Sequence, residues 1–383
     1  MRIGLVSDTY TPQVNGVTTV VRRIARVLER NGHEVGVVAP AYPGAAAPGS
    51  GELRVPSLPF PLYRAIRLSL PLRRRVDDFL DRLDPHVVHV CTEGPLGALG
   101  RWWALAHRVP LVTSFHTHFP EYARHYGAPF LAPLVWHWLV RFHQPARLTH
   151  TPGAAIRDEL ARRGLSQAVV WGRGVDAAHF RPSRRDAGWR RWLAGADETA
   201  VVLHVGRLAP EKNLDVLMES WRLAHTVLGT RATFVVAGEG PVARRLHARL
   251  PFVRQLGFLD RDTLAAVYAS ADLCVLPSPT ETCGLVALEA MASGLPVVAA
   301  DAGGLRENVR HGRTGLLIPP RDARGFLDAI VALVMSPPLR TGLGQAARAA
   351  ALERDVAHED AELLEHYASL GTPREPGGLT CAA

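Results

Sequence analysis

Two glutamates stand on either side of a predicted helix start in the segment Pro277 to Glu307, which reads PSPTETCGLVALEAMASGLPVVAADAGGLRE. Glu281 lies in the loop after a predicted strand, and Glu289 lies between one and two turns into the following helix. A loop at the carboxyl end of a strand and the first turns of the next helix border the same crevice, so both carboxylates are expected to reach it. Each carboxylate accepts two hydrogen bonds at once, which suits sugar hydroxyls. The free N–H groups where the helix starts, at Gly284 and Leu285, predict a diphosphate site.

Two cations occupy a second strand-to-helix loop, GRLAPEKN, from Gly206 to Asn213. Arg207 and Lys212 follow the apolar strand Val201 to Val205, and Lys212 is the only lysine among the 44 basic residues. One ammonium kept among so many guanidinium groups indicates a need for a compact, flexible charge. Together with a helix N-terminus, the two cations would neutralise a leaving diphosphate in place of Mg²⁺. A surface salt-bridge loop is the alternative.

We therefore expect neither a metal ion nor another cofactor. The single Asp-x-Asp triplet, Asp260 to Asp262, lies at a predicted helix start, where helix capping explains it without a metal.

A glycine in the first half of the chain marks a further loop that is suited to phosphate. Gly16 stands near the end of the loop Asp8 to Val17 and precedes a predicted helix. Without a side chain, it would allow a phosphate to approach the backbone closely. The pair Asn15 and Gly16 is also typical of a simple turn, so this loop alone is a weak indication.

The segment SFHTHFPEYARHYG, Ser114 to Gly127, leaves a predicted strand and carries two histidines near its start. A zinc pair would need a third ligand at a recognisable spacing, and the sequence has none. We expect His116, at the strand end, to make a polar sugar contact. For His118, Tyr122 and Tyr126, an acceptor pocket and simple packing are both open.

The elements that must position these residues alternate between strand and helix, which predicts an α/β fold of two doubly wound domains facing each other across a cleft. We predict an acceptor-side domain over 1–185, a nucleotide-binding domain over 186–350, a C-terminal helix over 351–370 that returns to the first domain, and a loose tail over 371–383. Residues 40–61 are expected to form a surface excursion. The predicted strands are 2–7, 34–39, 86–90, 111–114, 148–151, 169–171, 200–205, 233–237, 253–256, 273–277 and 296–300.

Composition narrows the class of protein. The net charge of +8 falls almost wholly in the first half, where Met1 to Ser183 contains 22 arginines against 13 acidic residues. A basic half-protein suits an anionic membrane or acceptor, and no nucleic-acid module is recognisable. The segment Tyr63 to Arg82, where arginines alternate with apolar residues, is the candidate for lipid contact, with a solvated helix face as the alternative.

Neither a transmembrane helix nor a secretory signal is predicted, so we expect a cytoplasmic protein, associated peripherally with the inner face of the cell membrane if lipid contact occurs. The four cysteines match neither a disulfide framework nor a zinc site and are expected to be reduced.

These motifs resemble, over essentially the whole chain, the retaining glycosyltransferases of family 4, which have the GT-B fold. The matching positions are Gly16, FHT at 115–117, GVD at 174–176, GRLAPEKN at 206–213, AGEGP at 237–241, Glu281, Glu289 and GLPVVAADAGG at 294–304. One departure is TPG at 151–153, where relatives tend to have serine after the proline.

The resemblance implies a role for each matched site residue. It places Arg207 and Lys212 on the donor phosphates, Glu281 on the donor sugar and Glu289 on the ribose, with His116 near the reacting sugar and Gly16 beside the phosphates.

Within this family the chain is most similar to GDP-mannose-dependent α-mannosyltransferases and to sulfoquinovosyl-diacylglycerol synthases. We expect a metal-independent, front-face transfer of a hexose, mannose from GDP-mannose in the first place, to a lipid or glycan acceptor. A double displacement through a sugar bound to Glu281 is the other retaining route. The functional alternatives are a UDP-sugar-dependent glycolipid synthase, a non-catalytic membrane-surface protein that binds sugar nucleotides, and a GT-B epimerase or phosphorylase.

Overall fold

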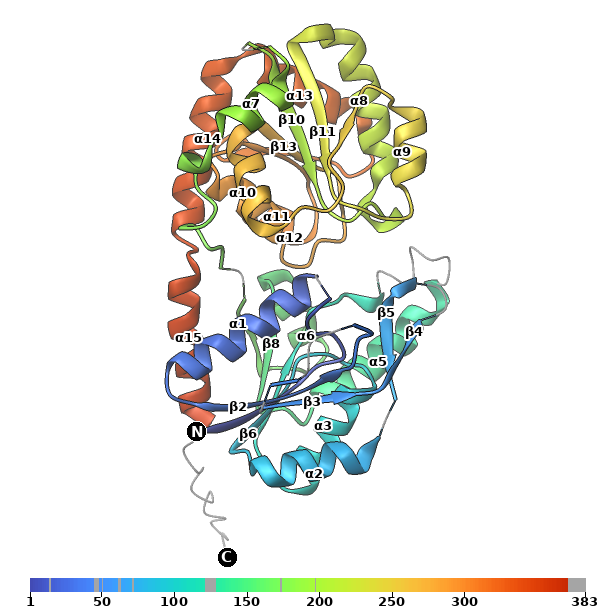
Figure 1. Ribbon diagram of the computed structural model, residues 1–383, viewed down its shortest axis with the longest axis vertical. Coiled ribbons are helices and arrows are strands. Elements are labelled where there is room, and N and C mark those ends of the chain that lie inside the picture. The colour runs from blue at the N-terminus through green and yellow to red at the C-terminus, as the bar shows by residue number, and fades with distance from the viewer. Residues whose placement is uncertain are drawn as a thin grey trace, which may run out of the picture.

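The computed structural model describes residues 1–13, 15–44, 48–49, 51–60, 63–70, 72–120, 129–172, 174–196 and 198–370, with the backbone alone at 60, 63–66 and 129. Two domains, each built on its own parallel sheet, are stacked end to end (Figure 1). This confirms the fold class predicted from the sequence. Among the described residues, no helix alone has the length and apolarity to cross a bilayer, and α13 and α14, which pass that test as a pair, are bent by 103° at their junction.

The N-terminal domain is a seven-stranded parallel sheet in the order β3-β2-β1-β6-β7-β8-β9. Alternate residues of β1 point to opposite faces. Ile3 and Leu5 pack with α1 on one face, and Val6 packs with α2 and α3 on the other. The strands and helices are β1 (Arg2–Val6), α1 (Gly16–Arg30), β2 (Glu34–Pro40), β3 (Glu52–Val55), α2 (Arg73–Leu83), β6 (Val87–Val90), α3 (Pro95–Ala106), β7 (Leu111–Ser114), α5 (Ala132–His143), β8 (Leu148–Thr151), α6 (Ala154–Arg162) and β9 (Ala168–Val170), with the short 3₁₀ helix η1 (Pro129–Leu131) before α5.

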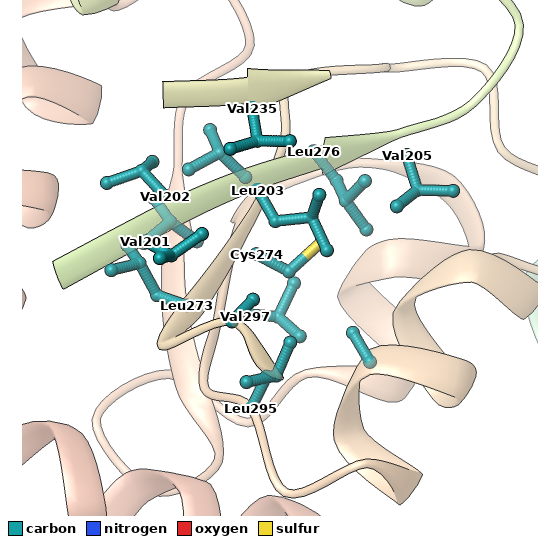
Figure 2. Close-up of a cluster of buried hydrophobic side chains, with 14 of the residues drawn as sticks. Val201, Val202, Leu203, Val205, Val235, Leu273, Cys274, Leu276, Leu295 and Val297 are labelled. Carbon is teal, nitrogen blue, oxygen red and sulfur yellow. The ribbon is translucent and has the colours of Figure 1, made fainter. Parts of the chain in front are cut away.

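The C-terminal domain is a six-stranded parallel sheet in the order β12-β11-β10-β13-β14-β15. Its central strands are almost wholly apolar because helices cover both faces, and their side chains form the core drawn in Figure 2. The strands are β10 (Ala200–Val205), β11 (Ala232–Ala237), β12 (Arg254–Gln255), β13 (Leu273–Leu276), β14 (Val297–Ala300) and β15 (Gly315–Ile318). The helices are α7 (Ala187–Ala194), α8 (Leu214–Leu228), α9 (Ala243–Arg249), α10 (Arg261–Ser270), α11 (Leu285–Ala292), α12 (Gly303–Asn308), α13 (Ala323–Met335) and α14 (Pro337–Leu352), with 3₁₀ helices η2 (Pro182–Arg184), η3 (Pro210–Lys212) and η4 (Gly229–Arg231).

The last helix, α15 (Val356–Leu370), leaves the C-terminal domain and packs against α1 of the N-terminal domain (Figure 1). Leu363, Tyr367 and Leu370 join the core on that face of the first sheet. Arg23 of α1 fixes the helix by an ion pair of 2.7 Å with Asp360. The chain therefore connects the two domains twice, once after β9 and once before α15.

Three expectations differ from the structure. Within 40–61, expected as a surface excursion, β3 pairs with β2 and extends the first sheet, because the short run Glu52 to Val55 is long enough to form an edge strand. The segment Tyr63 to Arg82 is not one helix: β4 (Ser57–Phe60) and β5 (Tyr63–Ser69) form an antiparallel hairpin, and α2 starts only at Arg73. Val175, Ala177 and Phe180 pack in the second core, so the second domain begins before the predicted boundary at 185/186.

Candidate active site

The loop after β10 places two cations at the carboxyl end of the second sheet, and glycines of the AGEGP segment support it. A Cβ atom on Gly238 would stand 1.9 Å from the carbonyl oxygen of Gly206, and one on Gly240 would stand 2.3 Å from that of Leu208. Both glycines also have φ in the left-handed region, at 139° and 158°. The AGEGP segment therefore holds the backbone of the cation loop.

Asn213 connects the cation loop to the loop after β13. Its φ of 55° is left-handed, and its side-chain amide donates hydrogen bonds of 3.1 Å to the Pro277 carbonyl and 2.5 Å to the Pro320 carbonyl. Asparagine tolerates this backbone conformation better than most residues. The amide thus draws the loops after two neighbouring strands together at one edge of the sheet.

Lys212 and Glu281 meet at this edge. The Lys212 ammonium lies 2.5 Å from Oε1 of Glu281, and the two side chains are 18% and 20% exposed. Burial tends to raise the pKa of Glu281, but the charge of Lys212 and its hydrogen bond outweigh burial, so the pKa lies below its ordinary value. Glu281 is therefore ionised.

Arg207 forms an ion pair with Glu211, a residue that the sequence interpretation did not single out. The Glu211 side chain is fully buried, whereas that of Arg207 is 35% exposed. The Thr280 hydroxyl donates 3.0 Å to the Glu211 carbonyl oxygen, which again joins the loops after β10 and β13. The i,i+4 spacing of Arg207 and Glu211 is the sequence signal for this pair.

The loop after β13 passes into α11 through Gly284. Its φ of 70° is left-handed, and a Cβ atom there would lie 2.9 Å from Nδ2 of Asn308, so glycine is required. Leu285 is the first residue of the helix, and Glu289 follows one turn later. Burial raises the pKa of Glu289 to about 7, although the Tyr268 hydroxyl, 3.3 Å away, favours the ionised form.

His204, within β10, lies beneath the Lys212 and Glu281 pair and was also missed by the sequence interpretation. Its Nδ1 donates 2.8 Å to the Val275 carbonyl, and its buried Nε2 has no hydrogen-bond partner among the described residues. Burial lowers the pKa of His204 to about 4, so the ring is neutral at pH 7. The feature of the sequence that could have identified His204 is a histidine within an otherwise apolar strand.

His116 faces the second domain from the loop after β7. Its carbonyl oxygen accepts a hydrogen bond of 3.2 Å from the Thr282 hydroxyl, one residue beyond Glu281. Burial, together with the charge of His143, lowers the pKa of His116 to about 4, so its ring is neutral. Its buried Nε2 has no hydrogen-bond partner in the described part of the chain. The loops carrying His116 and Glu281 therefore meet across the two domains.

The remaining first-domain residues are placed less directly. His118 binds Glu159 at 3.2 Å and packs edge-on against Trp136, at 5.3 Å between ring centroids, which supports the packing interpretation. Tyr122 and Tyr126 lie outside the described residues.

Gly16 is the first residue of α1 and follows the capping residue Asn15, and the space beside its Cα is open. In the second domain, Asp260 caps α10 through a hydrogen bond of 3.0 Å from the Thr263 amide.

Both halves of the chain match models of known protein families. Residues 14–179 match the family model described as Glycosyltransferase Family 4, and residues 199–336 match Glycosyl transferases group 1. A GDP-mannose-dependent alpha-mannosyltransferase of Mycolicibacterium smegmatis is 38% identical over 376 residues, covering 96% of this chain and 97% of the relative. Its namesake from Mycobacterium tuberculosis is 36% identical over 378 residues, covering 96% of each. The chain belongs to the family 4 glycosyltransferases.

Further relatives agree with this assignment. The sulfoquinovosyl transferase SQD2 of Arabidopsis thaliana is 35% identical over 349 residues, which cover 88% of this chain and 67% of SQD2. Among solved structures, Anabaena HepE in complex with UDP superimposes with a TM-score of 0.75 at 21% identity, covering 96% of this chain and all of that one. WaaG, a glycosyltransferase of lipopolysaccharide biosynthesis, gives 0.72 at 18% identity, covering 95% and 99%. These two structures confirm the GT-B fold.

In this glycosyltransferase, the GVD motif lies where the chain first crosses between domains. Asp176 accepts a hydrogen bond of 2.8 Å from Arg261 of α10 and caps the following turn at the His179 amide. The Val175 amide donates 2.9 Å to the Arg354 carbonyl, which belongs to the second crossing. The motif therefore holds the two crossing segments side by side.

In this nucleotide-sugar-dependent glycosyltransferase, most of the predicted site residues lie in one region. The carboxyl end of the second sheet carries Arg207, Lys212 and Glu281, with Glu289 on the adjoining helix. His116 approaches from the first domain. Cations beside a helix N-terminus suit a departing diphosphate, and a fixed carboxylate suits sugar hydroxyls.

Proposed function

We propose that this glycosyltransferase transfers mannose from GDP-mannose to a lipid or glycan acceptor. The observation that carries the proposal is the similarity to two mycobacterial enzymes named for that donor, which extends over 96% of this chain. A third such relative, from Corynebacterium glutamicum, is 29% identical over 97% of the chain. The similarity covers both domains, so it includes the loops that form the site.

The proposed mechanism is a front-face attack with retention and without a metal ion. The acceptor hydroxyl enters on the side from which the diphosphate leaves, and a phosphate oxygen takes its proton. Arg207 and Lys212 stabilise the charge that develops on the leaving diphosphate, because positioned cations act most strongly where charge grows in the transition state. Each cation already has a carboxylate partner, Glu211 or Glu281, which fixes its position before the donor binds.

The remaining roles are those that the family resemblance implies, and the positions and charges of the residues support them. The ionised Glu281 accepts hydrogen bonds from the donor sugar, and Glu289 accepts them from the ribose. The amide groups at Gly284 and Leu285, with the open backbone at Gly16, lie beside the phosphates. The neutral His116, whose carbonyl oxygen already accepts a hydrogen bond from Thr282 beside Glu281, lies near the reacting sugar.

The second candidate is a UDP-sugar-dependent glycolipid synthase, favoured by the similarity to SQD2. That similarity covers less of this chain than the similarity to the mannosyltransferases, so we place it second. The family assignment and the paired Lys212 and Glu281 favour an active transferase over a non-catalytic protein that binds sugar nucleotides.

The test is a donor panel with the purified protein and a lipid extract as acceptor. We expect release of GDP from GDP-mannose, an α-linked product by NMR, and full activity in the presence of EDTA. Lys212→Met should slow release about 10²-fold or more, whereas Arg222→Gln, which removes an exposed cation of α8, should not slow it. Release of UDP alone would show that the donor is a UDP-sugar and not GDP-mannose. Activity that vanishes with EDTA and returns with Mg²⁺ would exclude the metal-free mechanism.

A further inference from the structure

One face of the N-terminal domain exposes large apolar side chains from three neighbouring elements. Six residues of η1, α5 and α3 define it, and we call it the α3–α5 face. They are Trp102, Leu105, Phe130, Leu131, Leu134 and Trp138. Phe130 is 77% exposed, Leu134 66% and Trp138 43%. Leu134 and Trp138 are four residues apart, so they stand on the same side of α5, opposite its buried residues Trp136 and Leu139.

The helices that carry the α3–α5 face are in contact with each other. The Arg101 side chain of α3 donates hydrogen bonds to the carbonyls of Arg141 and Phe142 at the end of α5. The β4–β5 hairpin packs beside α3 and adds Leu58, which is 59% exposed. Figure 1 shows α5 and the hairpin together on the side of the domain away from α1 and α15.

The same elements contain no acidic residue. Neither η1, α5, α3, β4 nor β5 has an aspartate or glutamate in its sequence. The Arg73 guanidinium lies over the ring of Trp102, at 3.4 Å from its centroid. Arg74 and Arg75, both exposed, extend the basic border along the first turn of α2. The helix α2 also carries Asp77, Asp78 and Asp81, and Arg73 is paired with Asp77 at 3.2 Å. Arg74 and Arg75 are therefore the arginines of α2 that add positive charge beside the exposed aromatic rings.

We propose that the α3–α5 face docks on the surface of an anionic lipid bilayer. Tryptophan side chains favour the boundary between lipid headgroups and acyl chains, and arginine keeps its charge at the headgroups while its stem covers apolar surface. Anionic headgroups complement the arginines that border this face. A second copy of this chain would set like charges against each other, which disfavours that occupant.

Docking in this way puts the active site at the membrane. Phe119, in the loop that carries His116, packs against Trp138 at 6.4 Å between ring centroids. The loop thus joins the docked helix α5 to the contact between His116 and Thr282. The inference rests on the proposed function in one respect, that a lipid acceptor would enter from this side. Docking itself is measured without any sugar transfer.

The test is co-sedimentation of the full chain with vesicles of phosphatidylcholine alone or mixed with phosphatidylglycerol. We expect binding to the mixed vesicles that weakens as salt is added. The double variant Leu134→Ser with Trp138→Ser should bind about tenfold more weakly, because two exposed apolar side chains no longer enter the lipid. Arg74→Gln with Arg75→Gln should lose a similar factor on anionic vesicles only.

The matched control is Val227→Ser with Phe258→Ser, which removes two apolar side chains, 56% and 58% exposed, from the second domain. This control should bind like the wild type. Circular dichroism and thermal unfolding show that every variant is folded, and neither measurement depends on the donor proposal. Equal binding to neutral and anionic vesicles, no vesicle binding, or an equal loss in the control would overturn the inference. So would a dimer in light scattering that Leu134→Ser with Trp138→Ser converts to a monomer.

Discussion

Replacing Lys212 by methionine tests how the cation and Glu281 depend on each other. Their side chains are 18% and 20% exposed, and their charged atoms lie 2.5 Å apart. Removing one partner of a fully buried ion pair costs about 3–5 kcal/mol, and the remaining exposure places this pair at the lower end, about 3 kcal/mol. For a domain of this size, that loss lowers Tm by about 6–12 °C. Thermal and urea unfolding measure it.

The double variant separates folding from catalysis. Lys212→Met with Glu281→Gln leaves no unpaired charge, so it should recover most of the lost stability, with a coupling energy of about 2 kcal/mol. Turnover should fall about 10²-fold or more in both variants, since neither retains the cation at the leaving group. Single-variant effects that add to within about 0.5 kcal/mol would refute the coupling.

The pH dependence of the same variant has a defined sign. In the wild type the pKa of Glu281 is depressed, so this carboxylate stabilises the fold above its unfolded-state pKa and loses that contribution as pH falls through the folded value. In Lys212→Met, burial dominates and raises the pKa above its ordinary value. The stability deficit should therefore be larger at about pH 8 than at about pH 5. A deficit independent of pH would show that the two groups do not interact.

Three further predictions concern other carboxylates. Since burial raises the pKa of Glu289 from 4.5 to about 7, its contribution to stability falls as pH rises through that range, and Glu289→Gln should remove this slope from urea titrations. Glu211→Gln should lower kcat more than it raises KM, because Arg207 loses its buried anchor, whereas Glu219→Gln, on an exposed pair, should change little. Glu307 accepts hydrogen bonds of 3.0 and 2.9 Å from the first two amides of α6 in the other domain. Glu307→Ala should therefore cost about 1 kcal/mol and increase the radius of gyration in solution scattering, and an unchanged radius would show that this contact does not hold the domains together.

The sequence predicted the elements whose periodicity is strong. All eleven predicted strands agree with an observed strand to within one residue at each end, and the bounds of β7, β8 and β10 coincide, because short apolar runs between loop residues leave little choice of boundary. Short or half-exposed strands were missed: β3 pairs with β2 although Glu52 and Arg54 carry charge. The hairpin β4–β5 was missed for a similar reason, since pairing rather than periodicity forms it.

The candidate site was predicted in its main residues but not in its internal contacts. The positions of Arg207, Lys212, Glu281 and Glu289 after strand ends follow from the general rule for parallel sheets. The contacts that these side chains make do not follow from that rule. Lys212 meets Glu281 across 69 residues of sequence, and only the order of β10 and β13 in the sheet decides that their loops are neighbours.

The sequence by itself determined the two α/β units, the residue types at the strand ends and the excess of positive charge in the first half, because these depend on local composition and spacing. Tertiary structure alone decided that Glu211 is buried and paired with Arg207, that the His116 carbonyl meets Thr282 beside Glu281, and that α1 is the helix on which the returning α15 packs. Burial and long-range pairing depend on which elements pack together, and that packing fixes both the pKa values of Glu281 and Glu289 and the faces left exposed.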